Sequence, residues 1–324
     1  MEFNDQSFTS PDLETAIDRE PLIISPATSL TEAISLMGKV RNLSCEVASD
    51  RPDSEFTIPE RNRSGCALIM TGSKLLGILT ERDIVRLTAE KLVFETVTVA
   101  DVMTQPVITL ANSNFQDIFA ALFLFRRYRI RHLPVVDRAD RLLGVISPET
   151  IRQAMRPANL LKLRRVRDVM SKNIVHAPAT DTVLSVAQLM AESRVSCVII
   201  TEADEEEEIL LPVGIITERD ILQFQSLQTR LDNIEAGQVM STPLFLLSPE
   251  DSLLAAHQEM QRRRVRRLVV SWNWGQGLGI ITQTSMLRIF DPMEMYGTIE
   301  ALQSTVQQLK REKAELLALV NKTG

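Results

Sequence analysis

The sequence has few of the residues that mark secreted, metal-bound or membrane proteins. It holds three cysteines and three histidines among 324 residues, and neither set has the close spacing of a metal site. An odd number of scattered cysteines is typical of a reducing compartment. The polar, acidic first 20 residues do not resemble a secretion signal, and the longest apolar run, residues 118–125, is too short to cross a bilayer. We therefore expect a cytoplasmic protein without disulfides, bound metal or membrane spans.

Motifs of common catalytic sites are also missing. The sequence contains no P-loop, no G-x-G-x-x-G turn and no nucleophile elbow, and no cysteine is supported by a histidine as a catalytic pair. The net charge of −6 gives no general attraction for a polyanion, which argues against a nucleic-acid partner despite two local arginine clusters. We predict that the protein is not an enzyme.

What the sequence does have is an internal repeat. The heptapeptide GILTERD at residues 77–83 returns as GIITERD at residues 214–220, and two weaker copies, GVISPET and GIITQTS, begin at Gly144 and Gly279. The four leading glycines are 67, 70 and 65 residues apart. A second landmark, DVMTQPV, DVMSKNI or QVMSTPL, precedes the last three copies. The repeat predicts four units of about 65 residues, arranged as two pairs because the strong heptapeptide occurs only in the first and third.

Each unit alternates short apolar runs with amphipathic stretches. In the second unit, VITL, HLPVV and LLGVIS are typical of strands, whereas residues 114–128 and 148–155 have helical spacing. This pattern predicts an α/β (α+β) fold in which the order β-α-β-β-α recurs. The predicted divisions are a polar segment 1–19, domains 20–93, 97–157, 164–226 and 234–291, and a C-terminal helix 292–324. Polar insertions at 42–64 and 202–208 are expected to be solvated loops.

The DVM landmark, the run RHLPVVD at residues 131–137 and the G-x-x-T-x-R-D ending resemble cystathionine-β-synthase (CBS) domains. The resemblance covers residues 20–291. It implies that adjacent domains pair through their sheets into modules with two clefts, which commonly bind adenosine-containing ligands and regulate an attached protein. By this resemblance the regulatory ligand is an adenine nucleotide (AMP, ADP or ATP), with or without Mg²⁺, and no cofactor is required.

The repeated heptapeptide offers a candidate ligand site. Thr80 and Asp83, like Thr217 and Asp220, stand where a strand meets a helix, so they could form a capping box. The same helix start could also bind phosphate, and the acid could accept the hydroxyls of a ribose. The weak copies keep the hydroxyl but lack the acid, which favours a ligand role for the two aspartates. The resemblance implies the same contacts. Four further candidates in these heptapeptides are Arg82, Arg219, Gly77 and Gly214.

Arginine clusters precede a strand in the second and fourth units. By resemblance, the residues nearest these strands contact phosphate in the cleft of a domain pair; the candidates are Arg131, His132, Arg266 and Arg267. The guanidinium fork suits phosphate oxygens. The remaining arginines of each cluster end amphipathic helices, where we expect them to interact with the helix dipole and solvent. These are Arg126, Arg127, Arg262 and Arg263.

The C-terminal residues have a heptad pattern. Its apolar positions alternate three and four residues apart: Ile299, Leu302, Val306, Leu309, Leu316 and Val320. Ile or Val at a and Leu at d favour a parallel two-stranded coiled coil, and hence a homodimer. A helix folded back onto a domain is the alternative. The arrangement resembles the sensory front of bacterial signalling proteins, which implies an output domain of histidine kinase, PAS or cyclase type beyond residue 324.

These observations predict a regulatory sensor. It binds an adenine nucleotide in clefts between paired domains and passes the change through the C-terminal helix. One alternative is a structural scaffold whose clefts stay empty and whose repeats serve dimerisation. A nucleic-acid binder that uses the arginine clusters is the third interpretation.

Overall fold

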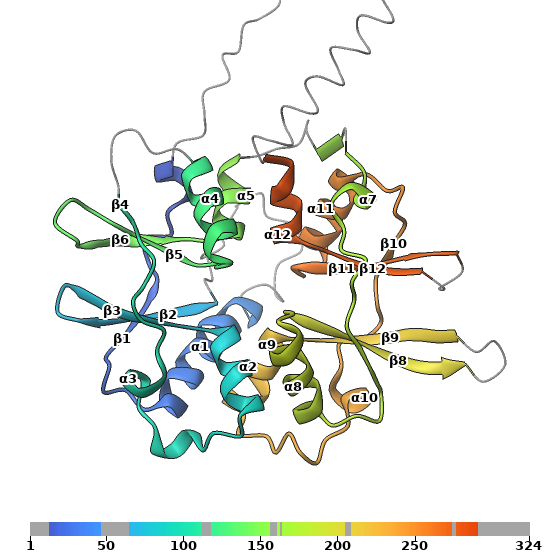
Figure 1. The fold of residues 1–324 in the computed structure, drawn as a ribbon, viewed down its shortest axis with the longest axis horizontal. Coiled ribbons are helices and arrows are strands. Elements are labelled where there is room, and N and C mark those ends of the chain that lie inside the picture. The colour runs from blue at the N-terminus through green and yellow to red at the C-terminus, as the bar shows by residue number, and fades with distance from the viewer. Residues whose placement is uncertain are drawn as a thin grey trace, which may run out of the picture.

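The computed structural model of the protein describes residues 13–46, 65–111, 118–155, 161–162, 164–204, 209–273 and 277–290. These residues form four three-stranded sheets (Figure 1). In each sheet the first strand is parallel to the second, and the third is antiparallel to the second. One helix connects the first two strands and another follows the third. The predicted β-α-β-β-α order and α/β class are confirmed.

The first two sheets belong to the N-terminal half of the chain. The first unit comprises β1 (Leu22–Ile24), α1 (Leu30–Glu46), β2 (Cys66–Thr71), β3 (Lys74–Thr80) and α2 (Glu81–Ala89). The second comprises β4 (Leu110–Ala111), α4 (Ile118–Tyr128), β5 (Leu133–Val136), β6 (Leu142–Ile146) and α5 (Pro148–Met155). Short helices η1 (Leu13–Ala16), η2 (Phe94–Thr96) and α3 (Val99–Val102) lie in the segments before each unit.

The other two sheets repeat this plan. The third unit comprises β7 (His176–Pro178), α8 (Val183–Ser193), β8 (Cys197–Asp204), β9 (Ile209–Thr217) and α9 (Glu218–Ser226). The fourth comprises β10 (Leu246–Leu247), α11 (Leu253–Arg262), β11 (Arg267–Trp272), β12 (Gly277–Thr282), α12 (Gln283–Met286) and η4 (Leu287–Phe290). Helices α7 (Val166–Val169) and α10 (Ala236–Val239) precede them.

The two sequence landmarks meet in space. The segment after Met103 pairs with β3 through Thr104 and Ile78, so a Cβ added to Gly77 would overlap the Met103 side chain. Gly214 has the same relation to Met240. The absence of a side chain at each glycine therefore allows the segment that leads into the partner domain to pack closely against the strand. This contact joins units 1 and 2 into one module and units 3 and 4 into the other.

The polar segment predicted at the N-terminus takes part in this pairing. Leu13, Ala16 and Ile17 are buried in the core of the second unit, and Asp18 forms an antiparallel bridge with Val145 of β6. The apolar residues of η1 repeat at a helical spacing, and η1 packs against α5.

The four units lie around a common centre (Figure 1). Units 1 and 2 form one side and units 3 and 4 the other, with α2 facing α8 and α9 across the boundary. The cores interpenetrate there, because Val85 of α2 lies in the core of unit 3 and Leu222 of α9 lies in the core of unit 1. The two modules are therefore joined by apolar packing as well as by the polar contacts described below.

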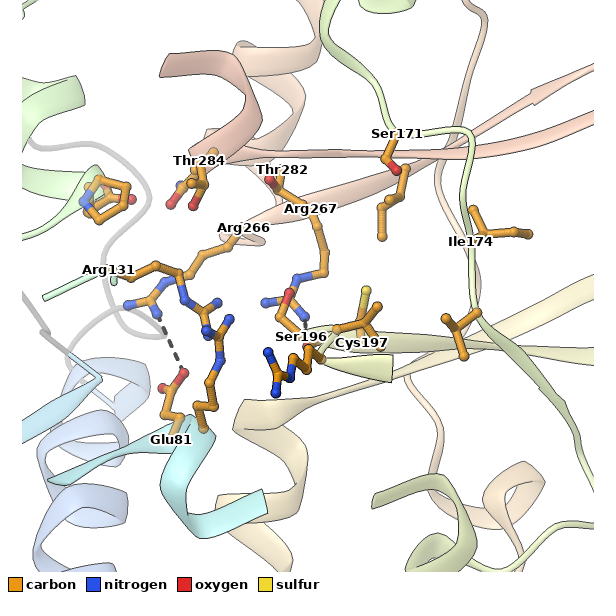
Figure 2. A pocket seen from close by; sticks show the side chains of 18 of the residues that line it. Glu81, Arg131, Ser171, Ile174, Ser196, Cys197, Arg266, Arg267, Thr282 and Thr284 are labelled. Atoms are coloured by element: carbon orange, nitrogen blue, oxygen red, sulfur yellow. Dashed lines mark hydrogen bonds and ion pairs between the residues drawn. The ribbon is translucent and has the colours of Figure 1, made fainter. Parts of the chain in front are cut away.

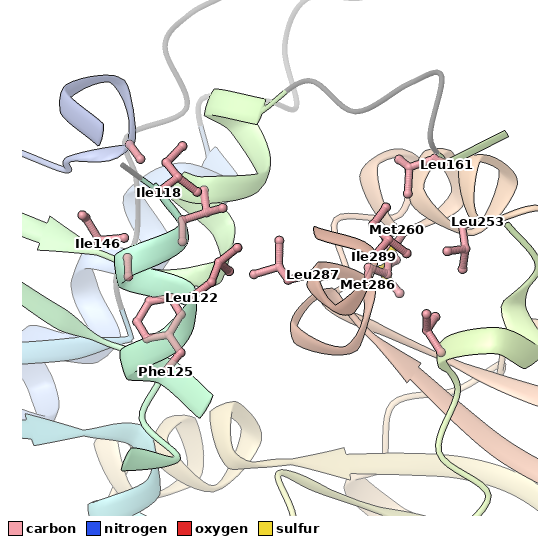
Figure 3. Packing of buried hydrophobic residues seen from close by; sticks show 14 of the residues in the cluster. Ile118, Leu122, Phe125, Ile146, Leu161, Leu253, Met260, Met286, Leu287 and Ile289 are labelled. Atoms are coloured by element: carbon pink, nitrogen blue, oxygen red, sulfur yellow. The ribbon is translucent and has the colours of Figure 1, made fainter. Parts of the chain in front are cut away.

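Units 2 and 4 meet in the same way (Figure 3). One continuous core contains Leu122 and Phe125 of α4 together with Met260 of α11 and Met286 of α12. Leu287 of η4 lies between the two groups of side chains, toward Leu122. Helical spacing of the apolar residues in α4 and α11 predicts the buried faces of these helices, but their partner across the module boundary is a tertiary result.

The structure differs from the sequence predictions mainly at the two insertions. Helix α1 continues to Glu46, and β8 continues to Asp204, where Glu202 pairs with Leu211. Polar residues can extend an antiparallel ladder because its hydrogen bonds use only the backbone. The predicted coiled coil and its heptad positions lie outside the described residues. No helix in the described part of the chain has the length and apolarity needed to cross a membrane.

Candidate functional site

A cavity of about 300 Å³ lies where the four units meet. Every unit contributes to its wall through the start of a strand or the first turn of a helix. From unit 1 come Glu81 and Arg82, from unit 2 Arg131, His132 and Glu149, from unit 3 Ser196 and Cys197, and from unit 4 Arg266, Arg267 and Thr282. Figure 2 shows Arg131, Arg266 and Arg267 directed into this space and Glu81 on the opposite side. The cavity therefore exists only in the assembled four-unit structure.

One end of the cavity is apolar. Ile174 and Val175 come from the segment before β7, Val195 and Ile199 flank the start of β8, and Ile280 lies in β12. Hydroxyls of Ser171, Ser196 and Thr282 border this slot, whereas Thr284 lies farther away, toward Arg266 (Figure 2). An apolar slot with a few polar groups at its rim is the usual environment of a planar ring in a binding site.

The other end is strongly basic but contains acids. Arg131 donates to Glu218, which also lies 3.3 Å from Arg82. Glu81 lies 3.6 Å from Arg219 and 3.8 Å from Arg266. Burial alone would raise the pKa of Glu81, but the charges of Arg266, Arg219 and Arg131 outweigh it and lower that pKa to about 2. Glu81 is therefore ionised at neutral pH.

The basic residues respond to burial in different ways. Burial, with the neighbouring charge of Arg219, lowers the pKa of Arg266 to about 10, so its guanidinium remains charged. Burial and the charge of Arg131 lower the pKa of His132 to about 3, so its ring is neutral at pH 7. Arg267 donates to the backbone carbonyl of Ser196 at the border with the apolar slot. The positive charge in this cavity is thus carried by arginines.

The four residues proposed from the arginine clusters converge on this cavity. Arg131 and Arg266 come from the second and fourth units, and each is followed by a second lining residue, His132 or Arg267. By contrast, Arg126, Arg127, Arg262 and Arg263 are not among the lining residues. The last two form ion pairs with Glu259, and the Arg263 guanidinium also lies 3.2 Å from the centroid of the Phe245 ring.

The repeated Thr and Asp residues form helix caps. The Asp83 carboxylate accepts hydrogen bonds from the Thr80 amide at 2.9 Å and the Thr80 hydroxyl at 2.7 Å, and the Thr104 hydroxyl lies 3.3 Å from its other oxygen. Thr217 and Asp220 form the same box at 2.9 and 2.8 Å. None of these four heptapeptide residues lines the cavity, although Glu81 and Arg82 beside them do.

The weak copies of the heptapeptide cap their helices as well. Ser285 and Thr282 exchange amide-to-hydroxyl bonds of 3.0 Å at the start of α12, and Ser147 and Thr150 exchange bonds of 2.9 and 3.3 Å at the start of α5. A hydroxyl three residues after the cap residue therefore completes the capping box as readily as an acid does. A ribose contact for Asp83 and Asp220 stays a prediction.

Sequence reasoning missed Glu81 and Glu218. The sequence marked Arg82 and Arg219 as further ligand candidates, whereas in the structure each contacts the glutamate of the other module's heptapeptide. A signal was available, because both strong copies have Glu after the Thr and the weak copies have Pro148 and Gln283 instead. Its meaning depends on the two helix starts facing each other, which no local pattern reveals.

Comparison with known families identifies the repeated unit. A sequence profile of the CBS domain matches residues 99–157, 166–226 and 236–291, which is more than half of the chain. The chain belongs to the CBS-domain family. The residues that precede these matches contain a further sheet of the same order, β1-β2-β3.

Several relatives are similar in sequence over part of their length. Protein MK0525 of Methanopyrus kandleri is 29% identical over 153 residues, which are 47% of this chain and 71% of the relative. MJ1225 of Methanocaldococcus jannaschii is 26% identical over 188 residues, 54% of this chain and 64% of the relative. An inosine-5′-monophosphate dehydrogenase of the same organism is 32% identical over 123 residues, but these are only 22% of that enzyme, so catalysis does not follow from the match.

Solved structures support the fold. The crystal structure of MJ1225 has a TM-score of 0.68 at 19% identity and covers 86% of this chain and 99% of that one. An uncharacterised conserved protein from Pyrococcus horikoshii has a TM-score of 0.54 at 15% identity, and the match covers 86% of this chain and 98% of that one. This CBS-domain chain therefore has the overall architecture of those proteins.

The structure also predicts how stability depends on pH. The pKa of His132 is 6.5 in the unfolded chain and about 3 in the folded one, where burial and the charges of Arg131, Arg266 and Arg82 oppose protonation and Glu81 favours it. Between these two pKa values the unfolded chain binds more protons than the folded chain. The contribution of His132 to the free energy of unfolding is therefore complete above pH 6.5 and is lost as the pH falls toward 3. We expect the free energy of unfolding to decrease by about 2 kcal/mol between pH 7 and pH 5.

Urea unfolding at the two pH values measures this change. His132→Gln should remove most of it, whereas the same substitution at exposed His176 should leave it intact. Ionised Glu81 adds a further loss only below about pH 4.5. Equal stability of the unsubstituted protein at pH 7 and pH 5 would contradict the neutral state of His132.

Proposed function

We propose that the protein is a regulatory CBS-domain sensor that binds an adenosine-containing nucleotide in the central cavity. The observation that carries this proposal is the continuity of the apolar slot around Ile174 and Ile280 with the arginine-rich end. A nucleotide has the matching distribution of properties, with a flat base at one end and phosphate at the other. The cavity volume of about 300 Å³ is at the lower end of the range for small-molecule sites, which fits a nucleotide better than a larger dinucleotide.

The proposed orientation follows from the side chains. The base occupies the slot between the segment before β7 and β12, and the hydroxyls of Thr282 and Ser196 lie at its border. The phosphate reaches Arg267 and Arg131, whose planar groups can each bind two oxygens. Helices α2 and α5 begin at this cavity, so the positive ends of their helix dipoles lie beside it. Thr80, Asp83, Thr217 and Asp220, which do not line this cavity, remain proposed ribose contacts.

The first unit is included in this proposal. Its sheet order, its paired segment at Thr104 and its capping box match those of the other three units. We therefore interpret residues 20–93 as a fourth CBS domain with an insertion at 42–64. Signal transfer through residues 292–324 to a partner helix is part of the same proposal.

Calorimetric titration with AMP, ADP, ATP and adenosine tests the assignment. Arg267→Gln should weaken binding of the phosphorylated ligands by about tenfold to a hundredfold, because a charge-assisted hydrogen bond contributes roughly 1.5–3 kcal/mol. Adenosine, which lacks the phosphate, should be affected far less. Arg262→Gln is the matched control, because Arg262 is exposed at the end of α11 and pairs with Glu259.

The same titration decides the role of the two aspartates. An Asp83→Ala/Asp220→Ala double variant that binds every nucleotide as the unsubstituted protein does would restrict these residues to helix capping. Failure of all four ligands to bind, with the fold intact, would instead favour the structural scaffold, in which the ion pairs between modules serve assembly alone.

A further inference from the structure

Two glutamates pair with cavity arginines, and one of these arginines is Arg131, which the phosphate of the proposed ligand reaches. The Glu218 side chain is only 1% exposed and contacts Arg82 and Arg131. Glu81 is 12% exposed, lines the cavity and contacts Arg219 and Arg266. Such burial of a carboxylate is costly unless opposite charges compensate it, so the four arginines are needed to hold the two acids in place.

The contacts are reciprocal between the modules. Glu81 begins α2 in the first module, and its arginines belong to the third and fourth units. Glu218 begins α9 in the second module, and its arginines belong to the first and second units. Each pair therefore crosses the boundary. The helices that carry the glutamates also pack against each other there.

An incoming anion competes with these carboxylates. A phosphate group that reaches Arg131 or Arg266 comes close to Glu218 or Glu81, and like charges at such short range repel strongly in a partly dehydrated cavity. A guanidinium can turn from one acceptor to another, because its donors are spread over a planar fork. The arginines can thus bind either the internal acid or an external phosphate, at the expense of the other contact.

We propose that Glu81 and Glu218 are internal counter-ions that an anionic ligand displaces from the cavity arginines. Binding then exchanges ion pairs between the modules for contacts to the ligand. The free and bound proteins consequently differ in how the modules are held together, which gives a ligand the unequal affinity for two packing states that regulation requires. The inference rests on the proposed function only where it takes the anion to be the phosphate of a nucleotide.

The experiment compares Glu81→Gln and Glu218→Gln with the unsubstituted protein. Glutamine keeps the shape and hydrogen-bonding capacity but removes the competing charge. Titration with inorganic phosphate should show binding at least about tenfold tighter in each variant, because removal of a like charge from a binding site relieves repulsion of that order. Glu90→Gln is the control: Glu90 follows the same helix α2 and forms an exposed pair with Arg86, so its loss should leave the phosphate affinity unchanged.

A second measurement uses the unsubstituted protein and does not depend on folding of the variants. Saturating phosphate should increase amide hydrogen exchange in the first turns of α2 and α9, where displaced glutamates no longer connect the modules. Equal or weaker phosphate binding by both folded glutamine variants, or unchanged exchange at these turns under saturation, would overturn the proposal.

Titration with AMP separates this inference from the proposed function. If AMP and phosphate both bind more tightly to the glutamine variants, both proposals are supported. If phosphate shows the gain but AMP binds no better than phosphate, the counter-ions stand and the nucleotide assignment fails. If AMP binds tightly and equally to all proteins, the nucleotide assignment stands and the counter-ions fail. If neither binds to any of them, both fail.

Discussion

Arg131→Met lowers the free energy of unfolding by about 3–5 kcal/mol, the cost of leaving a buried charge without its partner. The side chain of Glu218 is 1% exposed and would keep only its longer contact to Arg82, at 3.3 Å. Methionine fills a similar volume, so the loss comes from charge rather than from an empty space. Because the ion pair crosses the module boundary, the substitution also weakens the association of the two modules.

Urea unfolding followed by circular dichroism measures this effect. Arg127→Met serves as the control, because Arg127 is an exposed residue of the last turn of α4, and it should change stability by no more than about 0.5 kcal/mol. Combining Arg131→Met with Glu218→Met should recover much of the loss, because two apolar side chains replace the pair and the arginine that loses its partner, Arg82, is half-exposed. Equal stabilities of the Arg131 and Arg127 variants would show that Glu218 does not depend on Arg131.

Gly144→Ala destabilises the protein by at least about 2 kcal/mol, through backbone conformation and steric overlap together. Gly144 has a φ of +155°, which side chains rarely adopt. A Cβ at this position would overlap the backbone carbonyl of Asp18 and the side chain of Ile17. Asp18 and Val145 exchange two backbone hydrogen bonds of 2.9 Å there, so the N-terminal segment would be displaced from β6.

Gly72→Ala separates the two contributions. Gly72 also has a positive φ, +58°, but nothing lies within 4 Å of an added Cβ. Its substitution should therefore cost only the conformational strain, about 1–2 kcal/mol. Thermal unfolding of both variants provides the comparison, and faster proteolysis near residue 18 in the Gly144 variant reports displacement of the segment. A cost at Gly144 no greater than that at Gly72 would contradict the overlap.

Much of the fold could be predicted from the chain alone. The heptapeptides, the DVM landmarks and the alternation of apolar runs with helical stretches are local patterns, and they specify a repeated β-α-β-β-α unit. Backbone geometry explains this success, because hydrogen bonding and side-chain periodicity act within a few residues. The same locality explains why the end of β8 at Asp204 was missed, since a strand continues wherever a partner backbone is available.

The candidate site was only partly predictable. Four basic residues were recognised because they stand at strand starts in the second and fourth units: Arg131, His132, Arg266 and Arg267. The structure places them in one cavity. That His132 is neutral there could not be predicted, because its pKa depends on burial and on three arginines from different units. Asp83 and Asp220 illustrate the opposite case: their sequence spacing suits both a cap and a ribose contact, and the bonds they make in the structure are those of caps.

Local sequence was sufficient for the repeat, the strands and helices of each unit, the family resemblance and the basic residues at the strand starts. Only the tertiary structure showed that the four units share one cavity and that Glu81 and Glu218 each contact arginines of the opposite module. The physical reason is distance along the chain. Arg82 and Glu218 are separated by 136 residues, and their contact depends on how two modules pack, which no short-range pattern contains.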